Sequence, residues 1–206
     1  MINLKLILKS VILTGLVLSF SAFSHAEIAP DVLVRTTAED VLAIVKQDKD
    51  IQGGDQKKIF ALAEEKIVPN FNLDRVSRLV LGKNWLKASP QQQESFKKEF
   101  RTLLMRTYAT ALTKYKNQTI EYKPMRALPS DTNVTVKTLI NQASGPAIAV
   151  DYSLNKTDDA WKVYDIVIEG VSLVTNYRSQ FSQEIRQHGI DSLIKKLVDK
   201  NKAVAS

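Results

Sequence analysis

The chain of 206 residues has no cysteine, which excludes disulfides, thiolate catalysis, cysteine-ligated metals and a lipid anchor on an amino-terminal cysteine. Histidine is almost as scarce, because His25 and His188 are the only two. A serine hydrolase needs an imidazole as its base, and zinc sites draw on nitrogen and sulfur ligands. No glycine-rich phosphate loop is present either. We therefore expect no catalytic residues, no metal and no cofactor.

The first 26 residues have the pattern of a secretory signal peptide. Lys5 and Lys9 form a positive n-region, residues 11–23 form an apolar core, and a Ser-His-Ala triplet ending at Ala26 supplies small residues before a cleavage site. The apolar core is shorter than the roughly 20 residues of a membrane-spanning helix. We expect export, cleavage after Ala26, and a mature chain, residues 27–206, that forms a single domain.

Basic residues outnumber acidic ones by 29 to 22, for a formal net charge of +7. Removing the two lysines of the signal leaves 27 basic residues against 22, or +5. In an exported protein this excess suits an anionic membrane surface or an acidic protein rather than nucleic acid, although plain solubility explains it equally well. The basic positions that we expect to meet acidic partners or headgroups are Arg75, Arg78, Lys97 and Lys98.

The first part of the mature chain has apolar residues at helical spacing. Four helices are predicted, over residues 31–49, 55–67, 73–81 and 89–116. The fourth has the strongest start signal, with Ser89 as a cap, Pro90 at the first helical position and Gln92 to close a capping box. Its long apolar stripe includes Leu104 and Tyr108 and predicts packing against a sheet.

Beyond residue 118 the apolar period drops to two, which is typical of strands. An antiparallel meander of four strands is predicted, over residues 120–122, 134–140, 147–154 and 160–169. From Trp161 to Ile168 apolar residues fall on both alternate sets, which predicts a strand buried on both faces. Helical spacing then returns, with Ser172 as a cap and a last helix after Gly189. The expected fold class is α+β, whose sheet either closes a solid core or borders an apolar cavity.

Asp165 and Glu169 are the one pair of carboxylates that could act together as acid and base. An enzyme that uses them on a small polar substrate is therefore one alternative function. The alternative reading is structural: Asp165 accepts a hydrogen bond from Arg178 or from a neighbouring helix end, and Glu169 sits at the turn.

A series of short motifs runs through almost all of the mature chain. These motifs are Leu81-Gly82 with Trp85, Phe96 and Phe100, Leu103-Leu104 with Tyr108, Trp161-Lys162-Val163-Tyr164-Asp165, Ile168-Glu169-Gly170-Val171-Ser172, Tyr177-Arg178 with Phe181, and Gly189 with Leu193. In this order they resemble the MlaC family, the toluene-tolerance group of periplasmic phospholipid-binding proteins in Gram-negative bacteria.

The resemblance implies helices wrapped round a curved four-stranded antiparallel sheet, with an apolar pocket between them for the acyl chains of a phospholipid. It implies a soluble periplasmic carrier that shuttles phospholipid between an outer-membrane lipoprotein complex and an inner-membrane ABC transporter of the Mla pathway, and so maintains the lipid asymmetry of the outer membrane. Phospholipid is then cargo rather than cofactor, and the carrier is expected to be a monomer and not an enzyme.

A pocket for acyl chains must be dry, because the chains lose their apolar surroundings when they leave a bilayer, so no charged residue should line its depth. The candidate lining comes from the aliphatic strand face and the facing helix stripe: Leu104, Tyr108, Val134, Val136, Ile148, Val150, Tyr152, Val163 and Val167. Which face of the last strand points inward is left open. A second alternative function is a periplasmic chaperone or adaptor that holds unfolded chains on apolar helix faces.

Overall fold

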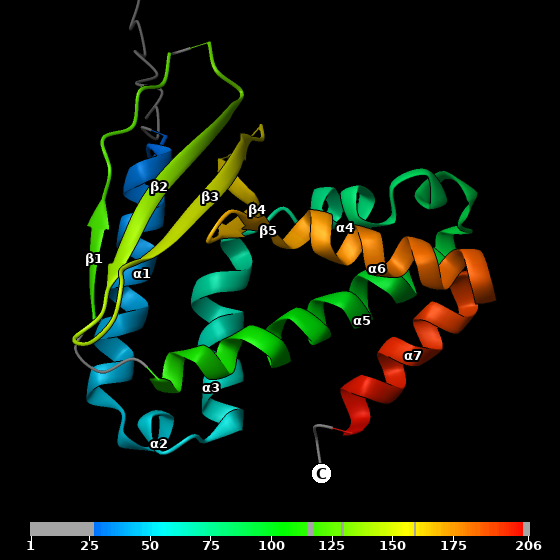
Figure 1. Ribbon diagram of the computed structural model, residues 1–206, viewed down its shortest axis with the longest axis horizontal. Coiled ribbons are helices and arrows are strands. Elements are labelled where there is room, and N and C mark those ends of the chain that lie inside the picture. Colours follow the sequence, from blue (N-terminus) through cyan, green and yellow to red (C-terminus); the bar gives the residue numbers. More distant parts are fainter. Residues whose placement is uncertain (1–26, 115–117, 129, 159, 204–206) are drawn as a thin grey trace, which may run out of the picture.

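The computed structural model of the protein describes residues 27–114, 118–128, 130–158 and 160–203 (Figure 1). The expected signal peptide, residues 1–26, lies outside the described residues. The described chain has helices before and after one antiparallel sheet, as the α+β prediction requires.

Three helices follow one another at the start of the described chain. They are α1 (Pro30–Gln47), α2 (Lys49–Gln52) and α3 (Gln56–Leu62). Aspartates begin the second and third: Asp48 accepts from the backbone of Asp50 and Ile51, and Asp55 accepts from that of Lys58. Helix α3 continues through a π-helical turn, η1 (Ala63–Ile67), and a 3-10 turn, η2 (Val68–Asn70). Buried residues join these elements in one cluster that includes Val41, Val45, Ile51, Ile59 and Leu62.

Four further helices form a second group. They are α4 (Leu73–Leu81), α5 (Pro90–Tyr108), α6 (Leu173–His188) and α7 (Ile190–Ala203), with 3-10 segments η3 (Gly82–Lys87) after α4 and η4 (Ala109–Lys114) after α5. The predicted capping box at Ser89 and Gln92 is confirmed. The core of this group is aromatic, with ring centroids 5.1 to 5.8 Å apart among Phe96, Phe100, Tyr177 and Phe181.

The sheet has five antiparallel strands in the order β1-β2-β3-β4-β5. They are β1 (Thr119–Tyr122), β2 (Asn133–Asn141), β3 (Ile148–Lys156), β4 (Trp161–Ile168) and β5 (Val171–Ser172). The sequence predicted only the first four. The fifth forms because Glu169 and Gly170 both take positive φ, 48° and 79°, and turn the chain back so that Ser172 pairs with Val167.

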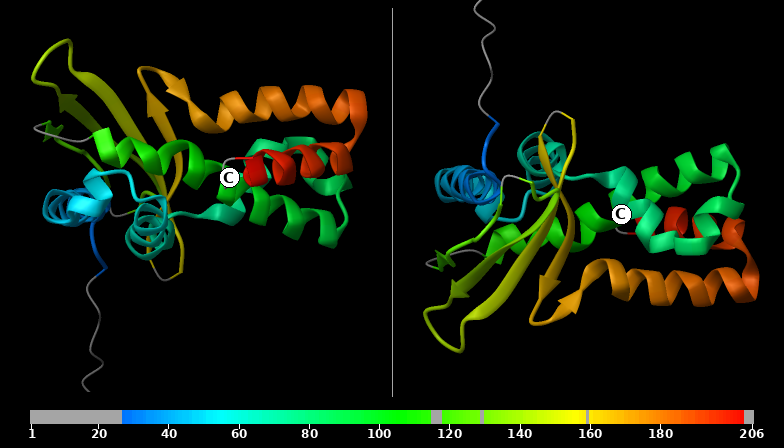
Figure 2. Two further views of the ribbon diagram at one scale, coloured as in Figure 1. Left: turned by 90° about the horizontal axis from the view of Figure 1, so that it is seen from below. Right: turned by 90° about the horizontal axis from the view of Figure 1, so that it is seen from above.

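The sheet and the helical group α4–α7 lie side by side. Figure 1 shows the sheet with α1 against it on one side and the group α4–α7 on the other, with α5 reaching from that group toward α3. Figure 2 shows the same separation from two further directions. The group α4–α7 joins the sheet along its β4 and β5 edge, where α4 and α6 contact β4. Across the described ranges, no helix combines the length and apolar character needed to cross a membrane.

Candidate functional site

One face of the sheet, here called the inner face, is apolar from strand to strand. The register places Val136 beside Tyr152, Thr138 beside Val150, and Ile140 between Ile120 and Ile148. The inner face comprises Ile120, Tyr122, Val134, Val136, Thr138, Ile140, Ile148, Val150, Tyr152, Leu154, Lys156, Trp161, Val163, Ile166 and Ile168. Lys156 is its one charged residue; it lies at the last position of β3, beside Trp161, and its ammonium pairs with Glu27 at 2.7 Å. The rest of the face is uncharged, as a surface that contacts acyl chains requires.

The half of the inner face nearest the start of α1 is fully covered by packed side chains. Val136 and Leu154 have no exposed surface, and they form a cluster with Val34 of α1, Trp161 and Val163. Half-buried side chains complete this cluster, namely Leu33, Phe71, Tyr122, Met125, Val134, Tyr152 and Ile166. The amino-terminal half of α1 thus covers this part of the sheet.

The other half of the inner face is packed differently. Among the described residues, Ile140, Ile148, Val150 and Ile168 are not members of the sheet cluster or of the two helical clusters. Register joins them across three strands, since Ile148 pairs with Ile140 and Val150 pairs with Ile168. They form a continuous apolar strip beyond the closed part of the sheet.

Hydroxyl groups lie between the two halves of the inner face. The Thr138 hydroxyl is buried and donates to the Val150 carbonyl at 2.7 Å. The pKa of Tyr152 is raised to about 12, mainly by burial and to a lesser extent by the nearby Tyr122, while a hydrogen bond with Thr138 opposes the shift. Tyr152 is therefore neutral at physiological pH, and the strip next to it stays uncharged.

A β-bulge in β4 decides which residues of that strand face inward. Leu154 pairs with Val163 and Ser153 pairs with Asp165, so Tyr164 is the extra residue between them. Val163 therefore lies on the inner face together with Ile166 and Ile168. Val167 lies on the other face, opposite Asp151. The prediction of a strand buried on both faces is confirmed in part, because no residue of β4 is exposed, Tyr164 packs against the core of the group α4–α7 and Val167 is half-buried. The two apolar sets seen in the sequence arise because the bulge moves one set from odd to even positions midway.

Leu104 and Tyr108 lie on α5 and pack against the aromatic cluster of the group α4–α7. Burial raises the pKa of Tyr177 well above its usual value, and a hydrogen bond with Tyr108 raises it further. Tyr108 is thus tied to the helical core. Of the nine residues expected to line a pocket, the structure brings Val134, Val136, Tyr152 and Val163 into one cluster and places Leu104 and Tyr108 in another.

Sequence reasoning missed several inner-face residues. Leu154 and Ile140 continue the period-two sets that gave Val136 and Val150, so the pattern could have included them. Ile166 and Ile168 were hidden by the bulge. Val34, Phe71 and Met125 contact the inner face from outside the sheet, and no local sequence pattern predicts these contacts.

The two carboxylates considered for catalysis have structural partners. Asp165 accepts from the Ser172 hydroxyl at 2.5 Å and from the Val174 N–H at 3.0 Å, at the beginning of α6. Glu169 occupies the turn after β4 and accepts from the backbone of Ala149. The structural reading of the pair is therefore confirmed for Asp165 as a partner of a helix end. In the described part of the chain, no group of three or more metal-ligating side chains gathers.

The opposite face of the sheet is polar in its middle and apolar toward one end, where Leu139, Ala149 and Val167 lie. Its polar part carries Thr135, Lys137, Asp151 and Ser153, and Lys137 lies 3.8 Å from the Asp151 carboxylate. A recess of about 360 Å³ near the start of β2 is lined by Arg126, Asp131, Asn133, Val134, Thr135 and Tyr164. The sheet thus separates an apolar side from a partly polar one.

Comparisons with known proteins agree with this geometry. The family model described as MlaC protein matches residues 35–199. The Intermembrane phospholipid transport system binding protein MlaC of Haemophilus influenzae is 30% identical over 176 residues, which cover 84% of this chain and 82% of that protein. Toluene tolerance protein ttg2D of Pseudomonas putida is 25% identical over 186 residues, covering 88% of this chain and 86% of that protein.

A solved structure is also similar. It is that of a phospholipid-binding protein from Ralstonia solanacearum in complex with a phospholipid. It is 40% identical to this chain, superposes with a TM-score of 0.80, and the match covers 85% of this chain and 98% of the other. The extent of the family match and the identity to these relatives show that the chain belongs to the MlaC family.

Proposed function

We propose that the protein is a periplasmic phospholipid carrier that holds acyl chains between the inner face of the sheet and the helices. The observation that supports this most is an inner face that is uncharged apart from Lys156 at the end of β3 and that continues past its closed part as the strip Ile140, Ile148, Val150 and Ile168. A family member that is 40% identical over nearly its whole length has been solved with a phospholipid.

The energy scale explains why such a strip must be dry. Two acyl chains with roughly 30 methylenes at about 0.8 kcal/mol each would lose on the order of 25 kcal/mol in water. A carrier has to offer apolar surface of similar extent so that lipid can leave a bilayer without that loss. The headgroup can remain in water at the edge of the sheet, so the carrier needs no charged group in its interior.

The proposed lining is the inner-face set rather than the set expected from the sequence. It keeps Ile148 and Val150 of the apolar strip, with Val134, Val136, Tyr152 and Val163 of the closed part beside them. Leu104 and Tyr108, half-buried beside the helical cluster, are proposed to contact the acyl chains from α5. The proposed lining replaces Val167 by Ile166 and Ile168, because Val167 lies on the opposite face. The carrier exchanges lipid with an outer-membrane complex and an inner-membrane transporter, as the resemblance implies.

The alternatives find less support. Asp165 accepts hydrogen bonds at the start of α6, so its carboxylate is already engaged and the Asp165 and Glu169 pair is poorly placed to act as acid and base. A chaperone would expose a contiguous apolar patch. The large apolar side chains that are exposed come instead from separate segments, namely Ile28 and Val32, Leu86, Leu128, and Val171.

The test is native mass spectrometry of protein purified from the periplasm without detergent, followed by organic extraction. We expect a stoichiometric diacyl phospholipid that survives purification. A mass without lipid, together with no uptake from vesicles that carry labelled phospholipid, would overturn the proposal.

A further inference from the structure

One long side of α6 is a polar surface. In both views of Figure 2 this helix lies along one margin of the helical group. Tyr177 and Phe181 face the core, whereas Arg178, Ser179, Arg186 and Gln187 are exposed. Six side chains line a recess of about 510 Å³ here, namely Arg178, Ser179, Ser182, Gln183, Arg186 and Gln187. Short serines between longer arginines and glutamines leave the middle hollow.

Two guanidinium groups near this recess are held in place. A Cβ added at Gly82 would lie 3.0 Å from both Nε and Nη2 of Arg178, so the guanidinium rests against the glycine backbone. Gly82 ends α4, where the partial negative charge of the helix terminus favours a cation. Arg78, one turn earlier, holds its guanidinium 5.5 Å from the ring centroid of Trp85. Both cations are therefore ordered before any partner arrives.

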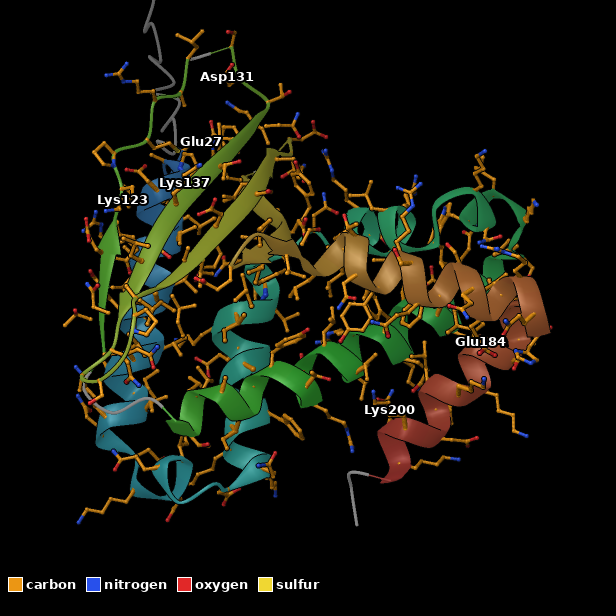
Figure 3. The ribbon with its side chains drawn as sticks, in the orientation of Figure 1. Glu27, Lys123, Asp131, Lys137, Glu184 and Lys200 are labelled. Atoms are coloured by element: carbon orange, nitrogen blue, oxygen red, sulfur yellow. The ribbon has the colours of Figure 1, made fainter. Side chains whose placement is uncertain are left out.

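Basic charge on this side is not balanced. We define the basic α6 surface as Arg78, Lys83, Leu86, Lys87, Arg178 and Arg186, from α4, η3 and α6. Across the residues that the structure describes, no ion pair engages any of its five cations. The one acid of α6, Glu184, is bound to Lys196 of α7 at 2.5 Å and lies between these two helices (Figure 3).

Some cations elsewhere on the helical group are paired with neighbours, whereas others, such as Lys98, Lys195 and Lys200, are in no ion pair with a described residue. Lys97 contacts Asp74 at 2.9 Å and Glu94 at 2.5 Å, and Arg101 pairs with Glu64. Of the basic positions expected from the sequence to meet partners, Lys97 is thus already paired, whereas Arg78 belongs to the basic α6 surface. What distinguishes the basic α6 surface from these other cations is its recess and the contact of the Arg178 guanidinium with Gly82.

We propose that the basic α6 surface docks an acidic protein surface on a membrane-bound complex that supplies or receives the lipid. This proposal rests on the carrier function, because a carrier must meet such a complex. A fixed guanidinium fork matches a carboxylate in bidentate geometry, and a hollow of this size accepts a protruding side chain. A lipid phosphate can also accept from a guanidinium fork, so vesicles made from lipid alone are the comparison that separates a bilayer from a protein partner. Leu86, 88% exposed, adds one apolar contact at the edge.

The test compares binding to two kinds of vesicle. One is prepared from envelope membranes of the native host, and the other is made from lipids extracted from those membranes. We expect the wild type to bind the first and not the second, and to lose binding as salt rises. The variant Arg178→Glu/Arg186→Glu should bind the native vesicles about tenfold less. Pretreating them with protease should abolish binding of the wild type.

A matched control is available on α7. Lys195→Glu/Lys200→Glu makes the same charge change at two exposed positions and should leave binding within about twofold of the wild type. Equal losses in both variants would mean general attraction, and equal binding to lipid-only vesicles would mean a membrane surface. Either result, or no binding of the wild type, would overturn the proposal. Native mass spectrometry of each variant reports lipid load separately, so failure of the carrier function is distinguishable.

Discussion

The Ser172 hydroxyl donates to Asp165 Oδ2 at 2.5 Å, while the Val174 N–H donates to Asp165 Oδ1 at 3.0 Å. Ser172 in turn accepts from the Thr175 N–H at 3.0 Å as the cap of α6. A single carboxylate therefore joins β4 to the first turn of α6, and its negative charge is favourable at that helix end. This contact connects the sheet to the helical group.

Replacing Asp165 by Ala should lower the free energy of unfolding by about 1–3 kcal/mol, because two hydrogen bonds to a charged acceptor are lost at a helix start. Urea unfolding measures this change. Asp199→Ala, at an exposed position of α7, is the control and should change stability by less than about 0.5 kcal/mol. Lipid load should remain that of the wild type; a stable variant that loses lipid would place Asp165 at the binding site instead.

Gly82→Ala should destabilise the protein by about 1–3 kcal/mol, since φ of 54° with ψ of −126° is a conformation that side chains with a Cβ rarely adopt. The new Cβ also meets the Arg178 guanidinium at 3.0 Å. The two causes can be separated, because Arg178 can move and the backbone cannot. In thermal unfolding, Gly82→Ala should therefore cost nearly as much stability in an Arg178→Ala background as in the wild type. If Gly82→Ala cost nothing in the Arg178→Ala background, the contact with Arg178, and not the backbone conformation, would be the cause of the destabilisation.

Glu184 should make a pH-dependent contribution to stability. Its pKa lies below its usual value of 4.5, first because Lys196 hydrogen-bonds to it and also because Ser192 and His188 are close. A pKa lowered by folding gives stability that is present above the unfolded pKa and is lost as the pH falls through the folded one. Glu184→Gln should thus unfold at lower temperature than the wild type at neutral pH, with the gap closing well below 4.5. A gap for Glu184→Gln that persists in acid would contradict the assignment.

The sequence predicted most elements because their signals are local. The capping box at Ser89, the cap at Ser172 and the alternation in β2 and β3 each depend on residues within a few positions of one another. These signals were enough for the α+β class and for the inner faces of β2 and β3. The resemblance in motif order added the family, which the comparisons confirm.

The parity of β4 could not be predicted because it changes within the strand. With Tyr164 inserted as a bulge, Val163 and Ile168 share a face although their separation is odd, and Val167 turns to the opposite side. Because the inward-facing apolar positions of β4 change from odd to even at the bulge, the sequence reads as if both faces of the strand were apolar. The short strand β5 could not be predicted either, because its pairing with β4 depends on the backbone conformation of Glu169 and not on a side-chain pattern.

The proposed acyl-chain strip is tested by two neighbouring residues that point to opposite faces. Ile148 and Leu139 are both half-buried at the same end of the sheet, Ile148 on the inner face beside Ile140 and Leu139 on the other face beside Ala149. A carboxylate among acyl chains costs several kcal/mol, because the charge loses its water. Ile148→Asp should therefore reduce bound phospholipid per protein by about tenfold or more, whereas Leu139→Asp should keep it within about twofold of the wild type. Quantified lipid extracts of the folded variants give both values. Equal lipid loads in the two variants would remove the inner face as the binding surface, and loss in Leu139→Asp alone would assign binding to the other face.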